Sequence, residues 1–395
     1  MESEPENPDH LLQASFQPYR SDKNYSSDSL LSSESCCQNG GQSCKKLPPF
    51  YNLVSDWTIQ MVEKYFHIFY TDEGTEYSGE FVLQKGGINT ELSPFHTKYL
   101  ADLKSILTFN GSMYTYKYRA KTKAKPMFRT ILNNISPQNT ADWKDRPIYQ
   151  YLHSIAVFVK YMIKYVDRLQ ETEWFDHNVP EEYYTELVGR FAEMCLLLTN
   201  HLPDKSVWKN LKGITVTSKP DLRLFKCDTQ DKVKETSFSV TQVKEDKYRD
   251  NKGENLAAKR MKISCSSDLD FDSKISKTTK RRPSKETANK VKGQHAGQLL
   301  LDLHSVHRKS FVNGSEYYMP GIIVHRTGVA VTMLVISKTH FEKIEKNEPL
   351  GLDDRAKIYV SCFYDYLNEE ERNELIQVFL IMNNIQEYHT EHDEN

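Results

Sequence analysis

The sequence predicts a mixed α/β (α+β) protein, in which a helical N-terminal region precedes a core with a central mixed β-sheet flanked by helices. Three patterns support this fold class. Apolar residues recur at helical spacing in several stretches before residue 200, apolar and polar residues alternate between Lys219 and Lys244, and β-branched residues dominate 320–337. With 395 residues, of which 38% are hydrophobic, the chain can form one large or two ordinary domains.

Charge and cysteine content narrow the class of protein. The formal net charge is −2, so any affinity for nucleic acid must come from local basic patches. The seven cysteines are scattered without paired C-x₂-C spacing, which favours reduced thiols in an intracellular protein. No apolar run approaches the ~18 residues that are needed to cross a bilayer. We therefore expect a soluble protein that is not secreted and has no membrane partner.

The N-terminal part of the chain divides at about residue 46. Residues 1–46 are rich in Ser, Asn, Gln and Gly, and we expect a disordered tail that is either a phosphorylation target and protein-binding segment or a plain linker. Residues 47–145 should be mainly helical. Ser55 is the expected cap of a first helix, and 99–109 and 126–135 have the pattern of two more.

A segment within this helical region alternates aromatic with basic residues. One interpretation is a nucleic-acid-binding strand, because aromatic rings stack on bases while cations contact phosphates. The alternative is an exposed hairpin whose lysines discourage pairing at its edge. The candidate binding residues are Tyr114, Tyr116, Lys117, Tyr118, Arg119 and Lys121.

Residues 146–388 form the expected core, which begins with two long helices. The first starts at Arg146-Pro147, and the second runs from Pro180 to about residue 202. The second helix carries Glu186 and Glu193, which are two turns apart and therefore share a face. These two residues are either metal ligands or ordinary solvated charges of a surface helix.

Three strands should follow, over 214–217 and in a hairpin that carries two polar motifs. Pro220-Asp221 opens the second strand, and Gln242-Val243-Lys244 ends the third. Because successive side chains of a strand face opposite ways, Gln242 and Lys244 share one face, and Asp221 can lie beside them. A carboxylate, an oxygen donor and an ammonium on adjoining strands suit a hard cation and a phosphodiester.

These residues and their order resemble the PD-(D/E)XK nuclease superfamily, which has the restriction-endonuclease-like fold. In that family the Asp of the PD pair begins one core strand, and the (D/E)XK triplet lies on the next. This chain has Gln242 where an acid is usual, and in this it is similar to the Mrr-like branch with QXK. The resemblance covers roughly 160 of the 395 residues and implies the core order helix, strand, strand, strand, helix, strand.

The resemblance implies Mg²⁺-dependent hydrolysis of DNA phosphodiester bonds. Lys244 would orient the attacking water or stabilise the transition state. The neutral amide of Gln242 removes one negative charge, which should weaken Mg²⁺ binding. The alternative is a catalytically inactive module of the same fold that binds nucleic acid or a protein partner. The implied metal ligands are Asp221, Gln242, the Val243 carbonyl and either Glu186 or Glu193.

A basic stretch, residues 247–292, interrupts the expected core. It holds fourteen Lys or Arg against six Asp or Glu, with few apolar residues, and we expect a flexible insertion on the sheet. Its two basic clusters are typical of nuclear localisation signals and can also contact phosphates, although such short runs arise easily in disordered segments. We expect a nuclear protein that is also found in the cytoplasm. The signal residues are Lys259, Arg260, Lys280, Arg281 and Arg282.

The rest of the core reads as helix, hairpin, strand and helix. A helix from His295 carries Gln298, which the resemblance makes a candidate neighbour of the active site. His304 and His307 lie on the same helix, and we interpret them as surface or partly satisfied histidines rather than metal ligands. The remaining expected elements are a hairpin over 320–337, a strand over 357–363, a helix over 370–382 and an acidic tail over 389–395.

Other chemistry lacks a motif in this sequence. The chain has no GxxxxGK[ST] phosphate loop, no GxSxG elbow and no HExxH pair. A helical regulatory scaffold would fit the many tyrosines, but it leaves the pattern between Lys219 and Lys244 unexplained.

Overall fold

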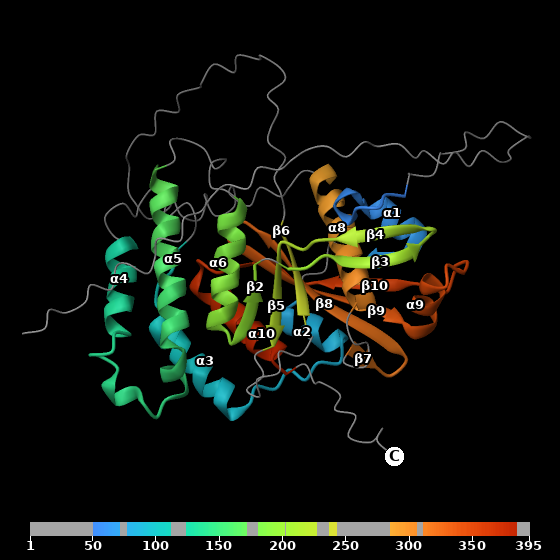
Figure 1. The fold of residues 1–395 in the computed structure, drawn as a ribbon. Coiled ribbons are helices and arrows are strands. Elements are labelled where there is room, and N and C mark those ends of the chain that lie inside the picture. Colours follow the sequence, from blue (N-terminus) through green and yellow to red (C-terminus); the bar gives the residue numbers. More distant parts are fainter. Residues whose placement is uncertain are drawn as a thin grey trace, which may run out of the picture. The chain divides into compact units, whose positions relative to one another are not determined.

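The protein is described by a computed structural model that covers residues 50–71, 77–111, 124–171, 181–201, 203–226, 237–242, 285–305 and 311–384. Pro48–Asn395 forms one compact unit. Within the described residues, helices lie on both faces of a nine-stranded mixed sheet, and a separate two-stranded sheet packs on one of these helices (Figure 1). The mixed α/β class predicted from the sequence is confirmed.

The main sheet combines antiparallel and parallel pairs. Among the described strands its order is β1-β10-β9-β8-β6-β5-β2, with β11 beside β9 and β7 beside β8. β1 is parallel to β10, β6 is parallel to β8, and the other pairs are antiparallel. The strands are β1 (Ile68–Tyr70), β2 (Leu197–Asn200), β3 (Ser206–Leu211), β4 (Ile214–Ser218), β5 (Leu222–Lys226), β6 (Ser237–Gln242), β7 (Val312–Asn313), β8 (Glu316–His325), β9 (Gly328–Ser337), β10 (Ala356–Val360) and β11 (Tyr364–Asp365).

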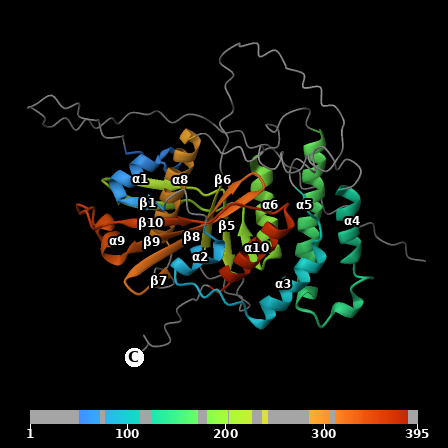
Figure 2. The same ribbon diagram turned by 180° about the vertical axis from the view of Figure 1, so that it is seen from behind.

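Helices α6 (Glu181–Met194) and α8 (Lys285–Ser305) cover opposite faces of the sheet around β5, β6 and β8 (Figure 2). Leu222 aligns with Val240 and Ile322 across these strands, and a Cβ at Gly189 of α6 would lie 3.5 Å from Leu222. Gly321 points the other way, where an added Cβ would meet Leu299 of α8 at 2.6 Å. The α-helices are α1 (Ile59–Phe66), α2 (Gly79–Lys85), α3 (Pro94–Ile106), α4 (Ala124–Asn134), α5 (Leu152–Glu171), α6 (Glu181–Met194), α8 (Lys285–Ser305), α9 (Lys338–Glu345) and α10 (Glu369–Met382). Short 3₁₀ helices cover Val54–Asp56, Ala141–Trp143 and Pro147–Tyr151.

The central hairpin of the sheet is the one that the β-branched run predicts. β8 and β9 pair along ten residues each, and most of their side chains are buried on both faces. Arg326 takes the left-handed conformation, with φ at 56°, and lets the chain reverse before Gly328. The predicted C-terminal strand and helix are also confirmed, as β10 and α10.

The described residues of the N-terminal region are mainly helical, as the sequence predicts, but they also contribute to the main sheet. α1 is capped by Thr58, whose hydroxyl accepts from the Met61 amide, and not by the expected Ser55. β1 follows α1 and pairs in parallel with β10. No boundary between compact units therefore falls at residue 145, because Pro48–Asn395 forms a single unit.

The C-terminal end that the sequence predicts for the second long helix is wrong. α6 ends at Met194, and Leu197–Asn200 form β2, where the sequence predicts helix to about residue 202. Leu196 adopts a left-handed φ of 67°, and the Tyr99 hydroxyl donates to the Met194 carbonyl at 2.7 Å, which satisfies the helix end. A short apolar run fits helix and strand periodicity equally, so only these contacts determine where the helix stops.

The expected first core strand, 214–217, lies in a different sheet. It is β4, which pairs with β3 and not with any strand of the main sheet, and β2 takes the place predicted for it. The β3–β4 hairpin packs on α8, where the Trp208 ring stacks on His304 with centroids 3.9 Å apart. Its turn uses Gly213 at φ 84°.

The basic insertion ends earlier than expected. α8 begins at Lys285, eight residues inside the stretch 247–292 that the sequence predicts to be unstructured. The first six residues of α8, 285–290, include only one apolar residue, Ala288, so this stretch lacks the apolar stripe that would reveal a helix in the sequence. The tails over 1–46 and 389–395 lie outside the described residues.

Candidate functional site

Strands β5 and β6 bring the two polar motifs to the same end of the main sheet. Leu222 pairs with Val240 in an antiparallel register, so the start of β5 lies beside the end of β6. Asp221 forms a bend directly before β5, and Gln242 is the last residue of β6, where it pairs with Val324. The predicted hairpin is confirmed.

The strand register also relates the positions of the two motifs. If the β5–β6 register continues, Thr241 lies opposite Asp221, and Gln242 lies opposite Pro220. Asp221 lies in a bend directly before β5, so strand alternation does not determine the direction of its carboxylate. Val243 and Lys244 lie outside the described residues, and the side chain of Gln242 is not described. The convergence of the three side chains therefore stays a prediction.

Arg190 holds both of the glutamates that were expected to complete a metal site. It lies 2.6 Å from Glu186 and 2.8 Å from Glu193 on the same helix. Partial burial acts against its charge, but hydrogen bonds to the two carboxylates outweigh this effect and raise the pKa of Arg190 above its ordinary value. Glu193 also accepts a hydrogen bond from Thr199 of β2. Both carboxylates are engaged in contacts within α6 and towards β2.

His201 extends this group of charges, and sequence reasoning missed it. Its Nδ1 lies 3.1 Å from Glu186, and its Nε2 lies 3.2 Å from the Thr199 hydroxyl. A Cβ at Gly189 would lie 2.7 Å from the ring, so only glycine leaves room for the imidazole against α6. A glycine inside an otherwise apolar-periodic helix is the sequence signal for such a close approach.

On the face of the sheet that α8 covers, opposite to α6, lies another group of buried polar side chains. Gln298 is only 1% exposed, and Asp302 lies one turn further along the helix. Asp302 accepts hydrogen bonds from Ser206 at 2.8 Å and from Arg223 at 3.1 Å. Because Arg223 lies two residues after Asp221, this contact fixes the start of β5 against α8. The sequence signal was a single acid within a leucine-rich helix, which indicates a buried partner.

Two histidines of α8 have structural roles. His295 is fully buried, 2.7 Å from the Thr332 hydroxyl, and burial lowers its pKa to about 3. His304 stacks on Trp208 and lies 3.1 Å from Glu345. Its partners agree with the interpretation of His304 as a partly satisfied histidine, while His307 lies outside the described residues.

The donor set fits a magnesium ion only in part. In the part of the chain that the structure describes, no group of three or more His, Cys, Asp or Glu side chains is arranged to hold a metal ion. Asp221 would contribute a carboxylate, whereas Gln242 is neutral and both glutamates pair with Arg190. Such a site would bind Mg²⁺ more weakly than a site with several carboxylates.

The remaining candidate segments lie outside the described residues. They are the aromatic and basic stretch from Tyr114 to Lys121, and the basic clusters around Lys259 and Lys280.

Comparison with models of known protein families and with curated proteins finds no match for this chain. Across the residues with a described position, none of the helices combines the length and apolar character that spanning a membrane requires.

Proposed function

We propose that this protein is a nuclease of the PD-(D/E)XK type, which hydrolyses DNA phosphodiester bonds with Mg²⁺. The supporting observation is the order of α6, β2, β5, β6, α8 and β8 along the chain and their directions. β2, β5 and β6 are antiparallel neighbours, β8 is parallel to β6, and α6 and α8 cover opposite faces. This succession supports the proposal because the resemblance implies the same core order, with Pro220-Asp221 before one strand and Gln242 at the end of the next.

Residues at the end of the sheet where β5 begins and β6 ends would carry out the chemistry. Asp221 would bind the ion with its carboxylate, and Gln242 and the Val243 carbonyl would add neutral oxygen ligands. Bound Mg²⁺ would supply a Lewis acid and lower the pKa of a water molecule. The Lys244 ammonium would stabilise the negative charge that builds on the phosphate during attack. The contact between Arg223 and Asp302 would keep the strand that follows Asp221 in place.

A second candidate is a binding module of the same fold without catalytic activity. The observation that favours it is the shortage of negative charge, because Glu186 and Glu193 already share Arg190 and position 242 holds a neutral amide. A weakly bound metal would leave the fold able to hold nucleic acid without cleaving it. The aromatic and basic segment from Tyr114 to Lys121 would then supply stacking and phosphate contacts.

A cleavage assay separates the two candidates. Purified protein is incubated with labelled single-stranded, duplex and branched DNA in Mg²⁺ or Mn²⁺, beside Asp221→Asn and Lys244→Met. The nuclease should lose at least about 100-fold in cleavage rate with either substitution, because each removes charge that acts in the transition state. Asp353→Asn and Lys209→Met change exposed residues of the same types and should leave the rate unchanged.

The outcomes assign the function directly. Cleavage that persists in Asp221→Asn would refute the proposed site. DNA binding by fluorescence anisotropy without cleavage, unchanged in Asp221→Asn, would favour the binding module.

A nuclear location belongs to the same proposal. Its support is the basic cluster Lys280-Arg281-Arg282 in the sequence. A fluorescent fusion should move from the nucleus to the cytoplasm when these three residues are changed to alanine, and an unchanged distribution would contradict the assignment.

A further inference from the structure

β10 carries basic and aromatic side chains on one of its sides. Arg355 directly precedes the strand, and Lys357 and Tyr359 follow at alternate positions, so the three side chains point to the same side of the sheet. Ile358, which lies between them in sequence, is fully buried on the other side. Residues two apart on a strand are separated by about 6.6 Å, so this row extends over about 13 Å.

Phe69 of β1 adds an aromatic ring beside this row. It lies opposite Lys357 in the parallel register of β1 and β10, and it is partly exposed. The Arg355 guanidinium lies 5.7 Å from the centroid of the Phe69 ring. This contact places the two side chains on the same side of the sheet, as the register and the alternation require.

The helix α2 borders the other end of the row. Phe81 stacks on Tyr77, with ring centroids 4.7 Å apart. The Lys85 ammonium, one turn further along the helix, lies 4.4 Å from the centroid of Phe81 and 5.7 Å from that of Tyr359. All three rings are partly exposed. We refer to Phe69, Phe81, Lys85, Arg355, Lys357 and Tyr359 as the β10 surface.

The β10 surface has three positive charges without a carboxylate partner. Lys85, Arg355 and Lys357 are all exposed. Within the described ranges of the chain, no ion pair involves any of them. Contacts with aromatic rings orient these cations but leave their charge uncompensated. The surface therefore favours an anionic partner.

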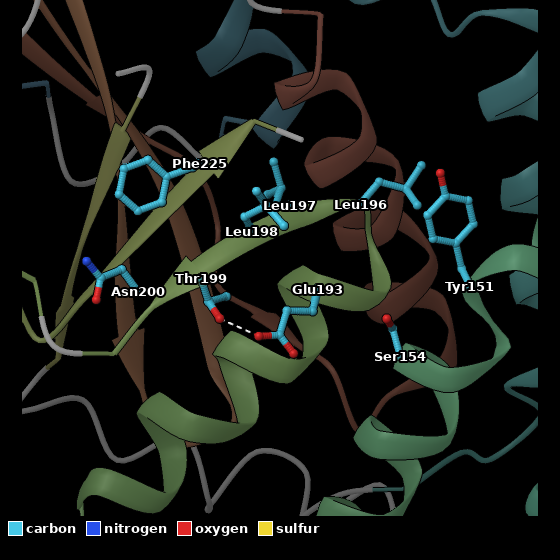
Figure 3. A pocket seen from close by; sticks show the side chains of 9 residues that line it. All are labelled: Tyr151, Ser154, Glu193, Leu196, Leu197, Leu198, Thr199, Asn200 and Phe225. Carbon is cyan, nitrogen blue, oxygen red and sulfur yellow. Dashed lines mark hydrogen bonds between the residues drawn. The ribbon is translucent and has the colours of Figure 1, made fainter. Parts of the chain in front are cut away.

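The pocket beside β2 lacks such free charge. It has a volume of about 540 Å³, and Glu193 is the charged residue among its described lining residues. Arg190 and the Thr199 hydroxyl both donate hydrogen bonds to this carboxylate, and the second of these is the dashed line in Figure 3. An ionic ligand therefore has less to gain in this pocket than on the β10 surface.

The row along β10 leads towards the end of the sheet that holds Gln242. Gln242, Val324, Val329 and Tyr364 are aligned across adjacent strands, over a span of about 14 Å. Phe363, which is 47% exposed, directly precedes Tyr364 and lies beyond the end of β10. A polymer that is bound along β10 would therefore extend towards the proposed catalytic end of the sheet.

Single-stranded DNA matches the chemistry of this surface. Its phosphates can pair with the exposed cations, and its unpaired bases can stack on the partly exposed rings. A duplex keeps its bases stacked inside and would use the cations alone. An acidic peptide would also pair with the cations, but it would leave the rings without a stacking partner.

We propose that the β10 surface binds single-stranded DNA and directs it towards the end of the sheet where Asp221 and Gln242 lie. Lys85, Arg355 and Lys357 would contact phosphates, and Tyr359 would stack on a base. The choice of DNA rests on the proposed nuclease function, whereas binding itself does not require cleavage.

Fluorescence anisotropy with a labelled oligo-dT of about twelve nucleotides measures binding by the full chain. EDTA is present, so that the DNA stays intact whether or not the protein is a nuclease. The test variant combines Lys85→Gln, Arg355→Gln and Lys357→Gln. Its affinity should be at least about tenfold lower, and the slope of log K against log salt should shrink by about two, because each lost phosphate contact removes about 0.7.

Three exposed lysines on α3 and α5 provide a control for the lost charge. The control variant, which should stay within about twofold of the wild type, combines Lys98→Gln, Lys104→Gln and Lys160→Gln. Tyr359→Ala should weaken binding at least about fivefold without a change in the salt slope, because stacking is not ionic. Tyr359→Phe keeps the ring and should retain the affinity.

A duplex of the same oligo-dT with oligo-dA should bind at least about fivefold more weakly than the single strand. The melting temperature shows whether each variant is folded. The proposal is overturned by unchanged affinity in the triple test variant or in Tyr359→Ala, by a duplex that binds as tightly as the single strand, or by tighter binding of oligo-U RNA.

A parallel cleavage assay in Mg²⁺ keeps the two proposals apart. Loss of DNA binding in the triple test variant without cleavage by the wild type would refute the nuclease alone. Cleavage that depends on Asp221, together with unchanged binding in the triple test variant, would refute the role of the β10 surface alone.

Discussion

His295 should make the free energy of unfolding fall steeply as the pH is lowered. The residue lies on α8 with no exposed surface, and its Nε2 is 2.7 Å from the Thr332 hydroxyl of β9. Burial disfavours the imidazolium and lowers the pKa to about 3, compared with 6.5 for an ordinary histidine. Between these two values the unfolded chain binds a proton that the folded protein does not.

The sign of the effect follows from this difference in bound protons. Because the unfolded state holds more protons below about pH 6.5, acid shifts the equilibrium towards unfolding. The stability is fully present above the pKa of the unfolded chain and is lost progressively as the pH falls towards 3. At pH 5 the loss from His295 is about 2 kcal/mol relative to pH 8.

His340 should add a similar loss, because it is buried and its pKa is lowered to about 4, chiefly by desolvation. The two histidines together would remove about 4 kcal/mol at pH 5, which is a large part of a typical stability of 5–15 kcal/mol. Urea denaturation at a series of pH values measures this loss. In His295→Gln the loss of unfolding free energy between pH 8 and 5 should shrink by about half, since one of the two buried histidines with a lowered pKa is gone.

A matched control is His153→Gln, which changes an exposed histidine on α5 and should leave the pH dependence of the wild type. The reasoning fails if His295→Gln loses as much stability on acidification as the wild type. It also fails if the imidazole of His295 titrates near pH 6.5 in ¹⁵N spectra of the folded protein.

Two further substitutions test contacts between distant parts of the chain. Arg372→Leu should lower the free energy of unfolding by about 3–5 kcal/mol, because the buried guanidinium donates to several backbone carbonyls, including those of Leu107 and Phe109 at 2.6 Å. Urea midpoints within about 1 kcal/mol of wild type would contradict this. Gly293→Ala should cost about 2 kcal/mol or more despite better helix propensity, because its Cβ would overlap the backbone of Thr58, the N-cap of α1. Gly351→Ala, whose Cβ would only reach ordinary contact at 3.5 Å, is the control in thermal melts and should stay near wild type.

Several elements could be predicted from the sequence because their signals are local. The β8–β9 hairpin has ten residues in each strand, and its signal is a high density of β-branched residues on both sides of the turn at Arg326. The hairpin of β5 and β6 follows from a Pro-Asp start and from alternation over a few residues. These features are properties of neighbouring residues and need no knowledge of the rest of the fold.

The sequence by itself thus determined the fold class, most of the helices and the two strands β5 and β6, which begin just after Asp221 and end at Gln242. Only the tertiary structure decided that α6 stops at Met194 and that β2, not β4, lies beside β5. It also decided that Glu186 and Glu193 share Arg190. The physical reason is that a short apolar run satisfies helix and strand periods alike, and that the partner of a charged side chain depends on which surfaces meet after folding.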